Sequence, residues 1–182
     1  MKAILRIPFD DPKTSIEVLY LAKETKYDSS GALYHMQLVR RRQQVYMQQF
    51  QNMKPVWDKQ IEQALAGIIN NYDAILSVPS QFPFASDFKN PIAMRFNTLT
   101  DLSSCLLKIN LNVKSSTNTS LARIRCNYRL KITAPRVRKG LIIVDDILNG
   151  GKTAFAVLCA FKRHPWNCLS HVLLIAPLWI VE

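Results

Sequence analysis

A run of aliphatic residues that ends in two adjacent carboxylates constrains this chain more than any other feature. Residues 141–144 are unbroken aliphatics, a pattern typical of a strand buried on both faces in a parallel sheet. Asp145 and Asp146 follow, and a small-residue turn over 149–153 leads into an apolar helical pattern over 154–161. This order predicts a site for a phosphorylated sugar, in which amides face a phosphate and carboxylates accept hydrogen bonds from hydroxyls.

The turn ends in Gly-Lys-Thr, which invites comparison with the phosphate-binding loop of nucleotide-binding proteins. That motif requires a glycine five residues before Gly151, and this chain has Asp146 there. A carboxylate at that point would face the phosphates that such a loop holds, so we reject this interpretation. The structural alternative to a sugar-phosphate site is a buried strand that ends in a helix-capping aspartate.

The charge of the chain indicates a polyanionic partner. Among its 182 residues, 24 Lys and Arg face 13 Asp and Glu, a net charge of +11. A diphosphate-bearing ligand and nucleic acid both fit this excess. The segment 102–144 holds nine basic residues and no acidic one, which favours a localised anion site. Arg40–Arg42 span about 200° of a predicted helix, so they form either a solvated basic surface or a contact with nucleic acid or an acidic partner.

Cysteine spacing and hydropathy bear on location. The four cysteines show no C-x-x-C pairing and no partnered histidines, so we expect neither a zinc module nor a disulfide framework, and no protein metal site. The N-terminus lacks the apolar core of a signal peptide. The longest apolar run, 172–181, is far shorter than the roughly 20 residues that span a membrane. The sequence therefore predicts a cytoplasmic protein without a membrane segment.

Apolar spacing predicts a single domain over 1–182, with a mainly helical part over 1–71 and a core sheet over 72–182. The expected fold class is α/β, an open, doubly wound, mostly parallel sheet that binds ligands at the carboxyl ends of its strands. We expect a mobile or aromatic-pinned loop over 81–91. The expected strands are 2–7, 73–79, 109–113, 141–144 and 171–176, and the expected helices are 14–23, 32–52, 55–71, 98–108 and 153–163.

Residues 141–153 resemble the phosphoribosyl diphosphate (PRPP) loop of type I phosphoribosyltransferases, which has hydrophobics, two acids, two hydrophobics and a small-residue loop. Motifs upstream, in order, resemble the ComF branch of that family; they are Ser77-Val78-Pro79-Ser80, Arg95-Phe96-Asn97, and Leu121-Ala122-Arg123 with Asn127. The chain departs from the pattern at Asn149-Gly150, in lacking a glycine between Arg95 and Phe96, and in lacking the branch's four-cysteine zinc module.

The resemblance implies roles for particular residues. Asp145 and Asp146 would take the ribose hydroxyls, and Mg²⁺ would enter as a cofactor bound through PRPP. Arg95 or Arg123 (or Lys89) would neutralise the leaving diphosphate. The remaining PRPP-binding residues would be Ser80, Gln81, Asn149, Gly150, Gly151, Lys152 and Thr153. His164-Pro165-Trp166 would be either a base pocket or, more simply, a helix stop.

Three functions follow. The first is Mg²⁺-dependent transfer or binding of ribose 5-phosphate by a phosphoribosyltransferase-like protein, with the acceptor and the existence of turnover left open. The second is a non-catalytic member of the fold that handles DNA or RNA through a basic surface, in a competence-like or regulatory role. The third, a phosphate-ester hydrolase or nucleotide kinase, lacks a recognisable nucleophile or phosphate loop. Assembly into an oligomer is compatible with each.

Overall fold

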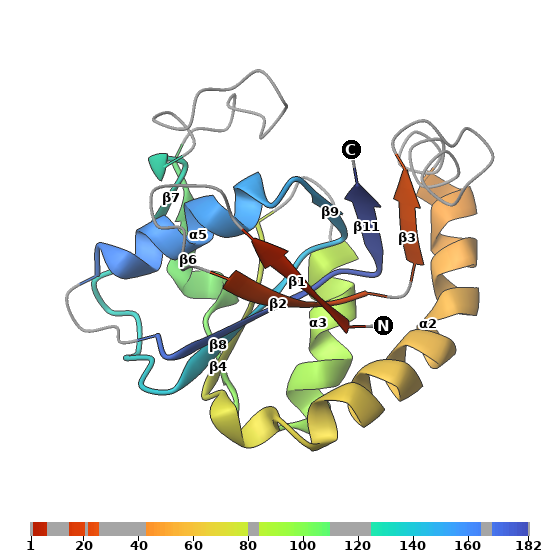
Figure 1. The fold of residues 1–182 in the computed structure, drawn as a ribbon, viewed down its shortest axis with the longest axis horizontal. Helices are drawn as coiled ribbons and strands as arrows, with labels where there is room; N and C mark the ends of the chain where they lie inside the picture. Colours follow the sequence, from red (N-terminus) through yellow and green to blue (C-terminus); the bar gives the residue numbers. More distant parts are fainter. Residues whose placement is uncertain are drawn as a thin grey trace.

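A six-stranded sheet lies at the centre of the computed structural model, which describes residues 2–6, 15–20, 22–25, 43–79, 84–109, 125–164 and 169–181 (Figure 1). In spatial order its strands are β1 (Lys2–Arg6), β2 (Ser15–Leu19), β10 (His171–Ile175), β8 (Gly140–Val144), β4 (Ala74–Ser77) and β5 (Thr100–Asp101). β1 is antiparallel to β2, and the remaining neighbours are parallel. The predicted α/β class with a mostly parallel sheet is confirmed.

Three of these strands continue, after a break, into a second parallel sheet. Its strands in spatial order are β3 (Ala22–Thr25), β11 (Leu178–Val181) and β9 (Ile147–Asn149). This order repeats that of β2, β10 and β8, and two residues separate each strand from its continuation. Asp145 and Asp146 are the two residues at the break between β8 and β9.

Helices cover the two faces of the central sheet. On one face α3 (Phe84–Arg95) packs against β4 and β8, and α2 (Gln43–Ala66) packs against α3. On the other lie α5 (Lys152–Lys162) and a two-stranded antiparallel sheet of β6 (Leu106–Lys108) and β7 (Tyr128–Leu130). Two single-turn 3-10 helices, η1 (Ile69–Asn71) and η2 (Ser103–Cys105), connect elements near β4 and β5.

The unbroken aliphatic run of β8 supplies both hydrophobic cores. Leu141 and Ile143 belong to the cluster that contains α5, whereas Ile142 and Val144 belong to the cluster that contains α2 and α3. Successive side chains of a strand point to opposite faces, so burial on both sides requires apolar residues at every position. The predictions of β8, β4, β10 and α5 are confirmed to within a few residues.

One of the first strands of the chain was predicted as a helix. The strand expected over 2–7 is confirmed by β1, but the helix expected over 14–23 is wrong, because these residues form β2 and enter β3. The side chains of Ile16 and Val18 are buried in the cluster that contains α5. The side chain of Leu19 is buried in the cluster that contains α2 and α3. This burial between β1 and β10 outweighs the local helical spacing.

The helix boundary expected between Asn52 and Pro55 is also wrong. One helix, α2, runs through both residues with Pro55 inside it. Trp57, Ile61 and Leu65 recur every four residues and are buried against the sheet side of the molecule. Proline has no backbone N–H, so the helix lacks one hydrogen bond at Pro55. The packing of these three side chains compensates for that loss. Residues 32–42 of the expected first helix lie outside the described residues.

Two further predictions fail between β4 and β7. The loop expected over 81–91 is the helix α3 from residue 84 onward, and residues 81–83 lie outside the described residues. The helix expected over 98–108 is instead β5, η2 and β6. Leu99, Leu102 and Leu106 are buried as expected, but from strands and turns. The strand expected over 109–113 lies outside the described residues except for Ile109.

The membrane prediction can be compared with the helices that the structure describes. None of them is both long enough and apolar enough to cross a bilayer.

Candidate functional site

The carboxyl ends of the parallel strands gather at one edge of the central sheet, with β8 between β4 and β10. Two backbone hydrogen bonds fix this edge. The amide of Val78 donates to the carbonyl of Val144 at 2.9 Å, and the amide of Asp145 donates to the carbonyl of Ile175 at 2.9 Å. Asp145 and Asp146, the acidic pair, thus follow directly after the middle strand of the sheet, at the edge where open α/β sheets bind ligands.

Both carboxylates of the acidic pair are buried and have defined local partners. Asp145 is 8% exposed and Asp146 is 4% exposed. The amide of Asp146 donates to Oδ1 of Asp145 at 2.9 Å, and the amide of Ile147 donates to Oδ1 of Asp146 at 2.9 Å. Each side chain therefore satisfies a backbone donor at the break between β8 and β9, which holds both carboxylates in fixed positions.

Tyr128 lies close to the acidic pair, a position that the sequence did not predict. Burial raises the pKa of its hydroxyl, and the negative charge of Asp145 raises it further. The side chain is 2% exposed, so its hydroxyl stays neutral within reach of the charge of Asp145. The alternation of Tyr128, Arg129 and Leu130 signals a short half-buried strand, but only the packing of β7 against α5 brings it to β8.

A turn of two glycines connects β9 to α5. Gly150 has φ of 62° and Gly151 has φ of 70°, both in the left-handed region that favours glycine. A Cβ atom at Gly150 would meet nothing within 4 Å, so its backbone angle rather than crowding requires glycine. Asn149 ends β9, while Lys152 and Thr153, both half-buried, begin α5. The amides of a helix's first turn carry the positive end of its dipole.

The structure does not bring Arg95 to the acidic pair. α3 begins after the carboxyl end of β4 and ends before β5, so Arg95, its last residue, lies toward the amino ends of the strands. Its guanidinium pairs with Glu62 at 2.7 Å and is 66% exposed. The other predicted ligand-neutralising residue, Arg123, lies outside the described residues, as do Ser80, Gln81 and Arg40–Arg42.

A polar network that the sequence did not predict joins the ends of β4 and β5. Lys89, expected on a loop, is buried in α3, where its ammonium pairs with Asp101 and donates to Ser103 Oγ at 3.3 Å. Ser103 Oγ also accepts from the amide of Ser77 at 3.0 Å. The Ser77 hydroxyl lies 3.1 Å from that of Ser86. These bonds fix the residue from which the chain leaves β4.

Asn127 is a second polar residue of interest near the start of β7. It is 1% exposed, and neither its side-chain oxygen nor its nitrogen has a hydrogen-bond partner among the described residues. An unsatisfied buried amide costs about 1–3 kcal/mol, so this position destabilises the described part of the fold. The sequence had marked this residue, because Asn127 belongs to the motif that begins at Leu121-Ala122-Arg123.

The described residues contain no group of three or more His, Cys, Asp or Glu that could hold a metal ion. Comparison of the chain with protein-family models, with curated proteins and with solved structures finds no match.

Proposed function

We propose that the chain binds PRPP at the carboxyl edge of its central sheet and serves in Mg²⁺-dependent transfer or binding of ribose 5-phosphate. One observation carries this proposal. A buried acidic pair ends the middle strand, and β9, a turn of two left-handed glycines and the start of α5 follow it directly. Asp145 and Asp146 accept hydrogen bonds from the ribose hydroxyls, while the amides of 150–153 hold the 5′-phosphate. The motif resemblance to the ComF branch supports the same assignment.

Magnesium fits this site as a partner of the ligand. Mg²⁺ prefers oxygen ligands and keeps several waters, and it is usually held by one or two carboxylates together with substrate phosphates. The acidic pair offers carboxylate oxygens, and the described residues form no dedicated metal cage. When bound with PRPP, the ion would offset negative charge on the diphosphate.

The chemistry that this arrangement supports needs no covalent protein intermediate. Displacement at the anomeric carbon releases diphosphate, so the protein must fix the ribose and neutralise the leaving group. The backbone hydrogen bonds to Asp145 and Asp146 hold the two carboxylates in place before the ligand arrives. Arg123 remains the candidate for the diphosphate, since Arg95 lies at the far end of α3.

The proposal is tested by calorimetric titration of the full chain with PRPP and Mg²⁺. Asn keeps the Oδ1 acceptor that each backbone amide uses, so Asp145→Asn with Asp146→Asn removes charge while preserving those bonds. We expect saturable binding to the native chain and at least about a tenfold loss in the double variant, because charged acceptors are stronger than neutral ones.

A matched double variant controls for the lost charge. Asp58→Asn with Asp87→Asn removes two carboxylates from α2 and α3 and should leave PRPP affinity unchanged. Circular dichroism checks that all variants are folded. Absence of binding to the native chain at millimolar PRPP, or an equal loss in both double variants, would contradict the proposal.

A further inference from the structure

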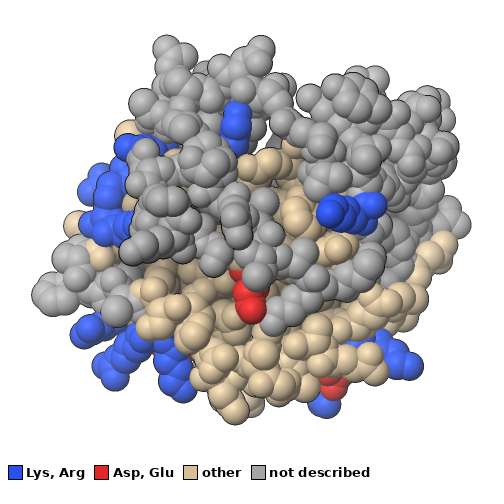
Figure 2. All heavy atoms as spheres, viewed as in Figure 1, with Lys and Arg blue, Asp and Glu red and all other residues tan. Residues whose placement is uncertain are grey.

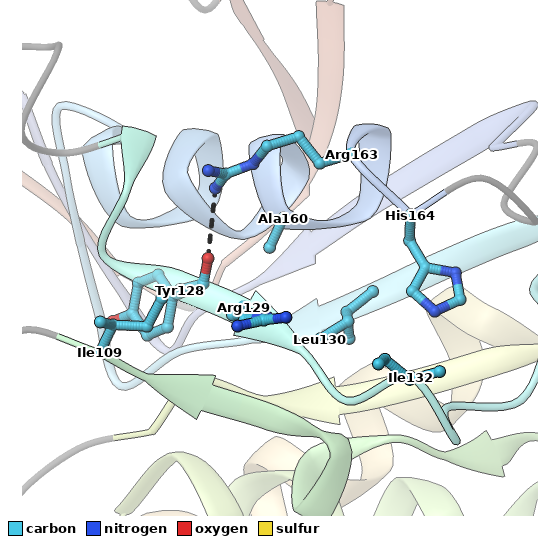
Figure 3. Close-up of a pocket in the computed structure, with 8 residues that line it drawn as sticks. All are labelled: Ile109, Tyr128, Arg129, Leu130, Ile132, Ala160, Arg163 and His164. Carbon is cyan, nitrogen blue, oxygen red and sulfur yellow. Dashed lines mark hydrogen bonds between the residues drawn. The ribbon is translucent and has the colours of Figure 1, made fainter.

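A pocket of about 450 Å³ opens between β7 and the last turn of α5 (Figure 3). Tyr128 and Leu130 of β7 and Ala160 of α5 line it. Ile132, at its rim, is 83% exposed. The glycine turn lies at the other end of α5, which has 11 residues and is therefore roughly 16 Å long. The volume and the apolar wall are those of a small-molecule site.

The pocket is also basic. Arg129, Arg163 and His164 line it, and none of the described lining residues is acidic. The side chain of Arg129 is exposed and forms no hydrogen bond or ion pair with any residue that the structure describes. Figure 3 shows Ile132 and His164 toward one end of the pocket and Ile109 and Tyr128 toward the other, with Arg129 between them. An unpaired guanidinium beside an apolar wall suits an anion that carries an apolar ring.

Arg163 fixes the wall of the pocket. Its Nε donates to the carbonyl of Cys159 at 3.0 Å, and its Nη2 donates to the carbonyls of Tyr128, at 3.2 Å, and of Arg125. These bonds tie the start of β7 to α5 (Figure 3). They involve no carboxylate, so the positive charge of Arg163 adds to that of the pocket.

The surface around the pocket carries further positive charge. Lys131 and Lys162, which are chain neighbours of lining residues, are exposed, and neither forms an ion pair with a described residue. In Figure 2, basic side chains gather at the left and lower left, beside the end of α5 and the segment that enters β8. Such a surface attracts anions and raises their local concentration at the pocket.

From these observations we infer that the pocket binds a nucleotide unit. The planar base lies against Ile132, whose side chain is exposed at the rim, and the phosphate faces Arg129. An apolar side chain can contact the face of any base, and arginine binds phosphate through its planar fork. The unit is either a free nucleotide or one residue of a single-stranded nucleic acid, which present the same base and phosphate. This inference is independent of the function proposed for the acidic pair.

Three probes separate the contributions of base and phosphate. The full chain is titrated by calorimetry with adenosine monophosphate, with adenosine and with ribose 5-phosphate, all without Mg²⁺. We expect adenosine monophosphate to bind at least about tenfold more tightly than either fragment, because only it uses both the apolar wall and Arg129. Equal affinity for ribose 5-phosphate and adenosine monophosphate would overturn the inference.

Variants assign the binding to this pocket. Arg129→Gln should weaken adenosine monophosphate about tenfold and leave adenosine unchanged, because it removes a charged hydrogen bond to phosphate. Ile132→Asp should weaken both ligands. Lys59→Gln, which neutralises an exposed lysine of α2, is the matched control and should change neither. An equal effect of Arg129→Gln and Lys59→Gln would contradict the inference.

Two more measurements identify the source of the ligand and exclude the acidic pair. Arg129→Gln should still weaken adenosine monophosphate about tenfold when it is made in the Asp145→Asn with Asp146→Asn variant; no effect of Arg129→Gln in that variant would place the nucleotide at the acidic pair and overturn the inference. A single-stranded 12-nucleotide deoxyadenosine oligomer that binds more tightly than the mononucleotide, with affinity falling as salt rises, would indicate nucleic acid. The reverse order would indicate a free nucleotide, and both orders support a nucleotide pocket.

Discussion

At the residue scale, the ion pair of Lys89 and Asp101 is strongly asymmetric. The side chain of Lys89 is 7% exposed, whereas that of Asp101 is 45% exposed. If Lys89 is replaced, the carboxylate of Asp101 remains in contact with water. If Asp101 is replaced, the ammonium of Lys89 remains in the protein interior without its ion-pair partner. Removing one partner of a buried pair is costly mainly because it strands the other charge. The two possible neutralising substitutions should therefore differ in effect.

We expect Asp101→Asn to lower the free energy of unfolding at pH 7 by about 1–2 kcal/mol, a value reduced for the solvent exposure of Asp101. Lys89→Met should lower it by less than about 1 kcal/mol, since it also removes the desolvation of the ammonium. Urea unfolding measures both, with Lys59→Met at an exposed position of α2 as a control that should change stability by no more than about 0.5 kcal/mol. A larger loss in Lys89→Met than in Asp101→Asn would contradict this account.

The same pair has a defined pH dependence. Burial raises the pKa of Asp101, but hydrogen bonds from Lys89 and Ser103 and the charge of Lys89 outweigh it, so its pKa lies below the usual range. The unfolded chain has the ordinary aspartate pKa of about 3.9. The stabilisation is therefore fully present above that pH and is lost as the pH falls through the lower folded pKa. The difference between native chain and Asp101→Asn should narrow below about pH 3.9; a difference that persists to acid would argue against it.

At the element scale, backbone conformation and not space requires a glycine in the turn between β9 and α5. Gly150 and Gly67 make a matched pair, because a Cβ atom at either would meet nothing within 4 Å. They differ in backbone angle, since φ is +62° at Gly150 and lies outside the left-handed region at Gly67. Comparing the same substitution at both positions isolates the cost of the left-handed conformation.

Gly150→Ala should destabilise the chain by about 1–2 kcal/mol, because an L-residue clashes with its own backbone in the left-handed region. Gly67→Ala should be neutral or stabilise by about 0.4–1 kcal/mol, by restricting the unfolded chain. Asparagine tolerates this conformation better, so Gly150→Asn should recover part of the loss. Thermal and urea unfolding of the three variants provide the measurement, and equal effects at both glycines would refute the explanation.

At the scale of the whole molecule, the central sheet joins two hydrophobic clusters. Trp57 lies in the cluster with α2 and α3, and Trp179 lies in the cluster with α5. β8 and β10 contribute residues to both, so neither cluster can lose its packing without disturbing the strands of the other. We therefore expect the two faces to unfold as one cooperative unit.

Fluorescence of Trp57→Phe and of Trp179→Phe, each combined with Trp166→Phe, tests this cooperativity, because the chain has three tryptophans and each double variant keeps only the indole on the opposite face. In each variant, the urea transition followed by fluorescence should have the same midpoint as the transition followed by circular dichroism. Each indole reports on its own cluster, because it contacts another ring there. The ring centroids of Trp57 and Phe88 lie 5.0 Å apart, and those of Tyr20 and Trp179 lie 5.2 Å apart. Separate midpoints for fluorescence and circular dichroism in either variant would indicate two units.

The sequence by itself determined the centre of this protein. An aliphatic run can be buried on both faces only inside a covered parallel sheet, so the identity and place of β8 followed from residues 141–144. The two glycines and the apolar pattern after them likewise located the turn and α5, because both signals are local. The candidate site was predicted to the extent that it is continuous in the chain.

Only the tertiary structure decided the rest, because it depends on pairing between distant segments. Residues 15–19 form a strand because β1 and β10 pair with them. Within residues 100–108, β5 pairs with β4 and β6 pairs with β7, so the predicted helix does not form. The surroundings of several charged side chains also depend on distant segments. Long-range packing brought Tyr128 close to Asp145, buried Lys89 beside Asp101, and carried Arg95 to the opposite edge of the sheet.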